Sequence, residues 1–259
     1  MGNLEGIDAV LLDLDGVLYV EGELLSGADD AVRRLRESGR SLRFVTNTTA
    51  NSRAQTLEKL RGFGIDLDET ELVTPAALAR RHCEDAGHRS VALIMNDDVK
   101  ADFEGLQQAD RDVDAVIMGD LGEQFGFWIL NQAFRLVMDG AELIALQKNR
   151  FWLTADGLSL DAGPFVAAIE YATGKDAFVV GKPAPGFFDI VLGDLACDPE
   201  AVTMVGDDVE TDVGGALNAG LSAVLVRTGK FREDFVRDSG IEPTETIDSI
   251  ADLPGLLGS

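Results

Sequence analysis

Two aspartates follow an apolar run near the start of the chain, and their types and spacing could do chemistry. In the segment AVLLDLDGV, Asp13 and Asp15 stand two positions apart at the end of a stretch with the composition of a buried strand. In extended chain, side chains two positions apart point to the same side. One carboxylate could therefore attack an electrophile while the other donates and accepts a proton. Burying such charges is unfavourable unless a cation or hydrogen bonds compensate them.

Polar residues occupy the same position after three other apolar runs. They are Thr46 and Asn47, then Lys182, then Asp207, Asp208 and Asp212. Open parallel sheets bind ligands at the carboxyl ends of their strands, so these side chains converge if the runs share one sheet. Asp13, Asp15 and Asp207 offer the oxygen ligands that Mg²⁺ prefers. Lys182 adds a positive charge and Thr46 a hydroxyl, so we expect a Mg²⁺ site with room for a phosphoryl group.

Short apolar runs alternate with helical patterns along most of the chain. Runs rich in Val, Ile and Leu that helices separate are typical of a parallel sheet covered on both faces. The expected strands of this sheet cover residues 10–14, 42–45, 72–73, 177–180, 202–205 and 223–226. The expected helices cover residues 28–37, 53–61, 76–84, 187–195 and 211–218. The pattern predicts an α/β fold with a Rossmann-like, doubly wound parallel sheet.

The middle of the chain predicts a separate inserted domain. Residues 1–78 and 177–259 would form the core, and residues 79–176 an inserted α+β domain with strands and helices of its own. The expected strands cover residues 91–95, 115–118, 143–146 and 151–154, and the helices residues 127–138 and 165–173. Trp128 and Trp152 are expected to pack in a core or between domains. His82 and His88 are expected to be surface residues.

Composition and charge exclude several classes of protein. The net charge of −24 would repel nucleic acid. No apolar run reaches the ~18 residues that would span a bilayer, and the first residues lack the pattern of a signal peptide. We therefore expect no membrane partner and a cytoplasmic location. Cys83 and Cys197 stand far apart and are expected to be reduced thiols.

With these residues identified, the sequence resembles the haloacid dehalogenase superfamily of phosphatases over nearly its whole length. The matching motifs are DLDG at residues 13–16, Thr46 after an apolar run, Lys182 in GKPAPGFF, and the acidic cluster VGDDVETD at residues 205–212. YVEGEL, residues 19–24, resembles the small flap hairpin that follows the first motif. More narrowly, the chain resembles the class IIA, NagD-like branch, which carries a large cap between the second and third motifs.

Other stretches, including GGALNAGLSAVLVRTGK at residues 214–230, also look like that branch. The resemblance is strongest to the subgroup that contains phospholysine phosphohistidine inorganic pyrophosphate phosphatase and the hydrolase domain-containing relatives. It implies Asp13 as the nucleophile and a Mg²⁺ ligand. It implies Asp15 as the general acid and base, which also gives its backbone carbonyl to Mg²⁺. The expected substrate is a small phosphate monoester or pyrophosphate.

The resemblance also implies roles for the remaining motif residues. Thr46 and Asn47 would bind the phosphoryl group, and Lys182 would orient it against the nucleophile. Asp207 would ligate Mg²⁺ directly. The carboxylates that would act on the metal from further out, through water or neighbouring groups, are Asp208 and Asp212. The branch also includes homodimers formed through the cap, so a homodimer is compatible with the sequence.

Two alternatives stay open beside the phosphatase. A dehalogenase of this superfamily uses an aspartate nucleophile without Mg²⁺, and the position of Asp15 is then usually not acidic. A protein that binds a phosphorylated ligand without turning it over would not need both Asp13 and Lys182. A mutase would carry a differently placed cap, and a phospho-accepting receiver module would place its aspartate after a middle strand and lack the insertion.

Overall fold

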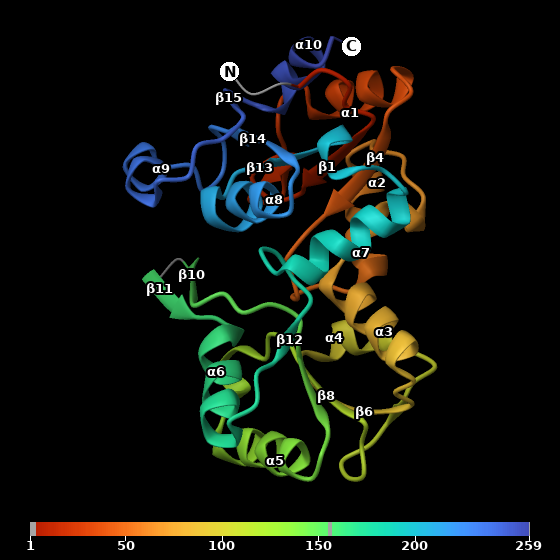
Figure 1. The fold of residues 1–259 in the computed structure, drawn as a ribbon, viewed down its shortest axis with the longest axis vertical. Helices are drawn as coiled ribbons and strands as arrows, with labels where there is room; N and C mark the ends of the chain where they lie inside the picture. The colour runs from red at the N-terminus through yellow and green to blue at the C-terminus, as the bar shows by residue number, and fades with distance from the viewer. Residues whose placement is uncertain (1–3, 155–156, 259) are drawn as a thin grey trace. The chain divides into compact units, whose positions relative to one another are not determined.

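The computed structural model describes residues 4–154 and 157–258, which fall into two compact units (Figure 1). The first unit comprises Met1–Thr46, Leu57–Val73 and Lys182–Ser259, and the second comprises Asn47–Thr56 and Thr74–Gly181. The second unit thus begins and ends a few residues outside the predicted insertion, 79–176, and also takes in residues 47–56. Their assignment as catalytic core and cap stays a prediction.

The first unit is built on a six-stranded sheet in the order β15-β14-β13-β1-β4-β5, and every neighbouring pair is parallel. Its strands are β1 (Ala9–Asp13), β4 (Ser41–Val45), β5 (Leu72–Val73), β13 (Val202–Gly206), β14 (Ser222–Val226) and β15 (Glu245–Ile247). Its helices are α1 (Ala28–Glu37), α7 (Pro185–Leu195), α8 (Gly215–Asn218), α9 (Glu233–Ser239) and α10 (Leu253–Leu256), with α2 (Arg53–Gly62) shared between the units. The predicted α/β class is confirmed.

Strand β1 lies at the centre of this sheet, and all five of its residues are buried. Its side chains alternate between the two faces, as they do in any strand. Val10 and Leu12 belong to a hydrophobic cluster with residues of α1, α2 and α10. The other side of the sheet is covered near β13 and β14 by the segment 209–218, which contacts both strands. Because both faces are covered, Asp13 at the end of β1 lies at the edge of a buried core.

The second unit holds a five-stranded sheet in the order β12-β9-β8-β6-β7, again parallel throughout. Its strands are β6 (Ser90–Ile94), β7 (Gln107–Gln108), β8 (Ala115–Met118), β9 (Glu142–Ala145) and β12 (Phe178–Val179), with a separate antiparallel hairpin of β10 (Phe151–Thr154) and β11 (Gly157–Leu160). Its helices are α3 (Pro75–Ala86), α4 (Asp97–Lys100), α5 (Phe127–Met138) and α6 (Ala162–Thr173). The main sheet is parallel, not the α+β arrangement expected for the insertion, because helices separate most of its strands.

The strand predicted at residues 177–180 exists but belongs to the other sheet. Strand β12 pairs with β9 in the second unit, and the first unit resumes only at Lys182. The prediction that this strand lies in the core sheet is therefore wrong. The local pattern of a buried strand is the same in either sheet, so the apolar run alone does not say which one it joins.

The structure also tests the predictions made for the flap hairpin, the cysteines and the tryptophans. The flap hairpin is confirmed, because β2 (Tyr19–Val20) pairs with β3 (Glu23–Leu24) in antiparallel fashion. Cys83 and Cys197 are free thiols. Trp128 is 79% exposed, so the prediction that it packs in a core is wrong, and packing between domains stays a prediction; the side chain of Trp152 lies outside the described residues. No helix in the described part of the chain is long and apolar enough to cross a membrane.

Candidate active site

The carboxylate of Asp13 is held at the end of β1 by a buried lysine. The ammonium group of Lys182 donates to Asp13 Oδ1 over 2.5 Å and to Asp212 Oδ1 over 2.7 Å. The side chain of Lys182 is 2% exposed. Lys182 comes from the segment before α7, not from the end of a core strand as predicted. Lys182 nevertheless contacts Asp13, as the sequence predicted, and Asp212 joins them.

Asp207 follows β13, the neighbour of β1, and is fixed by a loop that follows β14. Its Oδ2 accepts a hydrogen bond of 2.8 Å from the backbone N–H of Lys230. The hydroxyl of Thr228 donates to the carbonyl of Gly16 in the loop after Asp13. A β-carbon on either Gly16 or Gly229 would overlap the Asp207 carboxylate. Glycine at both positions therefore lets two loops close directly around this side chain.

Asp208 and Asp212 shape the chain after β13. Asp208 Oδ1 accepts from the backbone N–H groups of Glu210 and Thr211, both over 3.0 Å, and starts a π-helical turn over Val209–Gly214. The backbone N–H of Asp208 donates to Asp212 Oδ2 over 3.2 Å. The predicted helix 211–218 is thus split into this turn and the short α8. The turn carries Asp212 inward to Lys182, while Asp208 lies 3.7 Å from the Lys230 ammonium.

The remaining predicted residues lie at different points. Asp15 is exposed and stands beside Tyr19 of the flap hairpin, with which it forms a backbone bridge. Thr46 is buried directly after β4, whose last residue pairs with Asp13. Asn47 belongs to the second unit, where its side-chain oxygen lies against Gly181. The predicted contacts of Thr46 and Asn47 with a phosphoryl group stay predictions.

The electrostatics of the site reflect carboxylates crowded together in a buried place. Burial raises the pKa of Asp13, and the charges of Asp212 and Asp207 raise it further against the pull of Lys182. Burial and Asp212 likewise raise the pKa of Asp207. Although burial lowers the pKa of Lys182, Asp13 and Asp212 raise it above its ordinary value. The lysine therefore stays charged, and the carboxylates would be stabilised as anions by one more cation.

Asp13, Asp207 and Asp212 meet the requirements of a divalent metal ion. Each offers a carboxylate oxygen, and these oxygens all lie within 4.8 Å of one another. All three side chains are buried. An ion among them would also offset the mutual repulsion that raises the pKa values of Asp13 and Asp207. The donor set therefore fits a divalent cation.

The loop that holds Asp207 was not predicted from the sequence. Thr228, Gly229 and Lys230 follow a buried strand, as the predicted site residues do, and the strand-end rule could have found them. The side chain of Lys230 is 68% exposed, so it adds a positive charge on the solvent side of the site.

Comparison with known proteins identifies the family. A model described as haloacid dehalogenase-like hydrolase matches residues 10–108, and a second, HAD-hydrolase-like model matches residues 179–253. The two matches include Asp13 and Lys182 respectively. Haloacid dehalogenase-like hydrolase domain-containing protein 2 of Bos taurus is 45% identical over 232 residues, which cover 90% of this chain and 88% of the relative. The chain belongs to the haloacid dehalogenase-like hydrolase family.

Further relatives place it in the NagD-like branch. Phospholysine phosphohistidine inorganic pyrophosphate phosphatase of Xenopus laevis is 41% identical and covers 97% of this chain and 95% of its own. The crystal structure of a 4-nitrophenylphosphatase from Thermotoga maritima superposes with a TM-score of 0.89 at 27% identity, over 97% of this chain and 98% of the other. The solved structure of a putative nagD protein superposes with a TM-score of 0.85 at 28% identity, over 98% of this chain and 99% of the other.

Proposed function

We propose that this chain is a Mg²⁺-dependent phosphatase that hydrolyses a small phosphate monoester or pyrophosphate. The observation that carries the proposal is the buried Asp13 carboxylate, held by Lys182 next to Asp207 and Asp212. A carboxylate that Lys182 and a bound metal ion together keep ionised would be a nucleophile for phosphorus. The relatives named as phosphatases support the same class of reaction.

In the proposed reaction, a carboxylate oxygen of Asp13 attacks phosphorus, and the leaving oxygen departs with the bonding electrons. Asp15 gives that oxygen a proton, and an aspartyl-phosphate remains on Asp13. Asp15 then takes a proton from a water molecule whose oxygen attacks the same phosphorus. Phosphate leaves, and the carboxylate of Asp13 is restored. The exposure of Asp15 is compatible with its meeting a leaving group and a water molecule.

Asp13, Asp207 and the backbone carbonyl of Asp15 would hold the Mg²⁺ ion, and Asp212 is close enough to assist. When bound, Mg²⁺ would offset the negative charge of the phosphoryl oxygens during transfer. A donor set made of oxygen alone favours Mg²⁺ over softer metal ions. Lys182 would orient the nucleophile and the phosphoryl group, for which the predicted further contacts are Thr46 and Asn47.

Phosphate release from a panel of small phosphate esters and pyrophosphate tests this function. We expect turnover of one or a few members with Mg²⁺ and loss of turnover with a chelator. Asp13→Asn should lower kcat by more than about 10³-fold, because it keeps the shape of the side chain and removes the nucleophile. Asp8→Asn is the matched control, since Asp8 is exposed just before the other end of β1.

Three results would contradict the proposal. Unchanged turnover in the presence of the chelator would show that the reaction does not require the metal ion. Substantial turnover by Asp13→Asn would show that Asp13 is not the nucleophile. Silence across the panel from a folded, Mg²⁺-loaded protein would favour the alternative of a protein that binds a phosphorylated ligand without hydrolysing it.

A further inference from the structure

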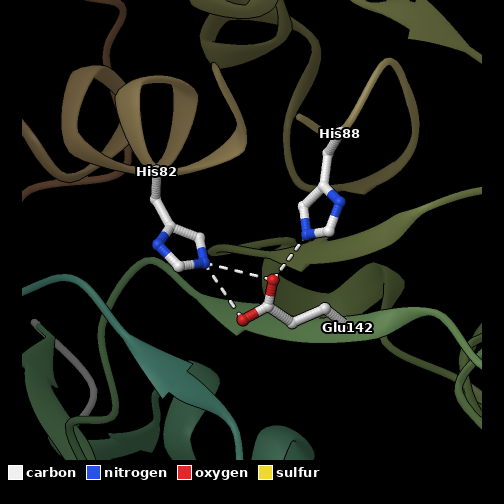
Figure 2. Close-up of side chains that lie close together, drawn as sticks. All are labelled: His82, His88 and Glu142. Carbon is white, nitrogen blue, oxygen red and sulfur yellow. Dashed lines mark hydrogen bonds and ion pairs between the residues drawn. The ribbon is translucent and has the colours of Figure 1, made fainter. Parts of the chain in front are cut away.

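The second unit brings together the only two histidines of the chain. Figure 2 shows His82 and His88 on either side of the Glu142 carboxylate. The Nε2 atom of His82 lies 3.0 and 3.1 Å from the two carboxylate oxygens, and the Nε2 atom of His88 lies 2.6 Å from Oε2. Both histidines were expected to be plain surface residues. The structure instead half-buries them and joins them through one carboxylate.

The end of helix α3 determines where the two rings lie. His82 stands in the last part of α3, and Gly87 then ends the helix in the left-handed region at φ 78°. The N–H of His88 turns back to the carbonyl of Cys83 over 2.8 Å. This arrangement is a common way for a helix to terminate at glycine. It places the ring of His88 next to that of His82 although five residues separate them.

Neighbouring contacts hold the other two side chains in place. The ring of His82 stacks on that of Phe178, with centroids 3.8 Å apart and planes 15° from parallel. Glu142 is the first residue of β9, and its N–H donates to the carbonyl of Asp114 over 2.9 Å. The three side chains thus come from the end of α3, the turn after it and the start of β9. Their approach to one another is fixed by the backbone of each element.

We propose that His82, His88 and Glu142 form a binding site for a transition-metal ion of the Zn²⁺ class. Two imidazole nitrogens and one carboxylate oxygen are ligands that Zn²⁺ takes in proteins. The three ligand atoms lie within 4.8 Å of one another, so one ion reaches them all. Imidazole ligands suit Zn²⁺, Cu²⁺ and Ni²⁺, whereas Mg²⁺ prefers oxygen. The site therefore differs in chemistry from the aspartate cluster of the first unit.

The surroundings of the cluster leave an ion a way in. The side chains of His82 and His88 are each 20% exposed and that of Glu142 is 34% exposed. A fourth ligand, such as water, can therefore complete the coordination from the solvent side. The cluster lies at the amino end of the parallel strands, since Glu142 begins β9 and His88 precedes β6. Ligands of open parallel sheets bind at the opposite, carboxyl end of the strands. We therefore infer that the ion has a structural role and links α3 to β9.

X-ray absorption at the zinc edge tests the proposal on the full chain, freed of any histidine tag and kept in excess Mg²⁺. Because the chain has no other histidine, imidazole scattering around the zinc identifies His82 and His88 as its ligands. We expect about one equivalent of Zn²⁺ with imidazole and carboxylate ligands. His88→Gln should weaken Zn²⁺ binding by at least about 10-fold. Removing a residue that only hydrogen-bonds to a metal ligand already costs about that much affinity, and His88 is a ligand itself.

Two controls separate this site from the aspartate cluster. Asp207→Asn alters the other cluster and should leave the imidazole signal unchanged. Circular dichroism and the metal-free Tm show whether His88→Gln is folded. If this variant does not fold, the X-ray absorption spectrum of the wild type still tests the proposal. Oxygen-only scattering around zinc in the wild type would overturn the proposal. Equal Zn²⁺ affinity of the wild type and a folded His88→Gln would overturn it as well.

Discussion

At the scale of single residues, Lys182 is a buried positive charge. It is almost fully buried and donates to two carboxylates, Asp13 and Asp212. A buried charge whose partner is removed is strongly destabilising, because the remaining charge has neither water nor a counter-ion. Lys182 thus serves the stability of the first unit as well as the proposed chemistry.

Replacing Lys182 with methionine should therefore lower both activity and stability. The apolar stem is kept, but Asp13 and Asp212 lose their cation. We expect kcat to fall by about 10²–10³-fold, as when one group that stabilises transition-state charge is removed. We expect the free energy of unfolding to fall by about 3–5 kcal/mol, less if the carboxylates take up protons. Lys100→Met, which removes a partly exposed lysine on α4, should leave both quantities near the wild type. Wild-type kcat in Lys182→Met would exclude Lys182 from the site.

Gly16 can be tested against a glycine with the same backbone strain. Gly16 and Gly39 have φ values of 88° and 84°, so alanine should strain both backbones by roughly 1–2 kcal/mol. Only at Gly16 would the new β-carbon meet the Asp207 carboxylate; at Gly39 nothing lies within 4 Å. We expect Gly16→Ala to weaken binding of the divalent ion, measured by calorimetry, and Gly39→Ala to leave it unchanged. Equal metal affinity in the two variants would show that Asp207 does not depend on this close packing.

At the scale of elements, the rule that site residues follow parallel strands explains most of what the sequence revealed. Strands β1, β4 and β13 are neighbours and all run the same way, so Asp13, Thr46 and Asp207 emerge at one edge. The rule failed for Lys182 because β12 belongs to the other sheet. It would have reached Lys230 had it been applied to β14. Which sheet a strand joins depends on packing between distant segments, which a local apolar pattern does not contain.

The π-helical turn after β13 depends on the Asp208 cap. Its side chain accepts two backbone N–H groups that the turn leaves without a partner. Asp208→Ala should lower the free energy of unfolding by about 1 kcal/mol, the usual effect of losing such a cap, whereas Asp208→Asn should largely retain it. Chemical denaturation of the metal-free protein measures both. Equal losses in the two variants would assign the effect to the charge near Lys230 instead of the cap.

For the whole molecule, the net charge of −24 opposes the approach of a phosphorylated substrate. Lys182 and Lys230 supply positive charge at the site, but the long-range field remains negative. Salt screens such fields over about 8–10 Å at physiological ionic strength. We expect kcat/KM for an anionic ester to rise as ionic strength increases from a low value at constant Mg²⁺. A steady fall of kcat/KM over the same range would show that local positive charge dominates the encounter.

The division into two units is only partly predictable from the sequence. The alternation of strands and helices indicated the α/β class and an insertion. It did not reveal that residues 47–56 join the second unit or that the second sheet is parallel. Trp128 was expected to pack in a core or between domains, yet its side chain is exposed on α5. Similarly, nothing in the spacing of His82, His88 and Glu142 shows that they meet, because the contact forms only when β9 pairs within its sheet.

Trapping the covalent intermediate tests the central claim most directly. Borohydride reduces an aspartyl-phosphate to homoserine, so protein quenched during turnover with Mg²⁺ should carry homoserine at position 13, as read by peptide mass spectrometry. Protein without substrate, and the variant Asp13→Asn, should carry none. Homoserine at another aspartate, or steady turnover with no modified peptide, would contradict the assignment of Asp13 as the nucleophile.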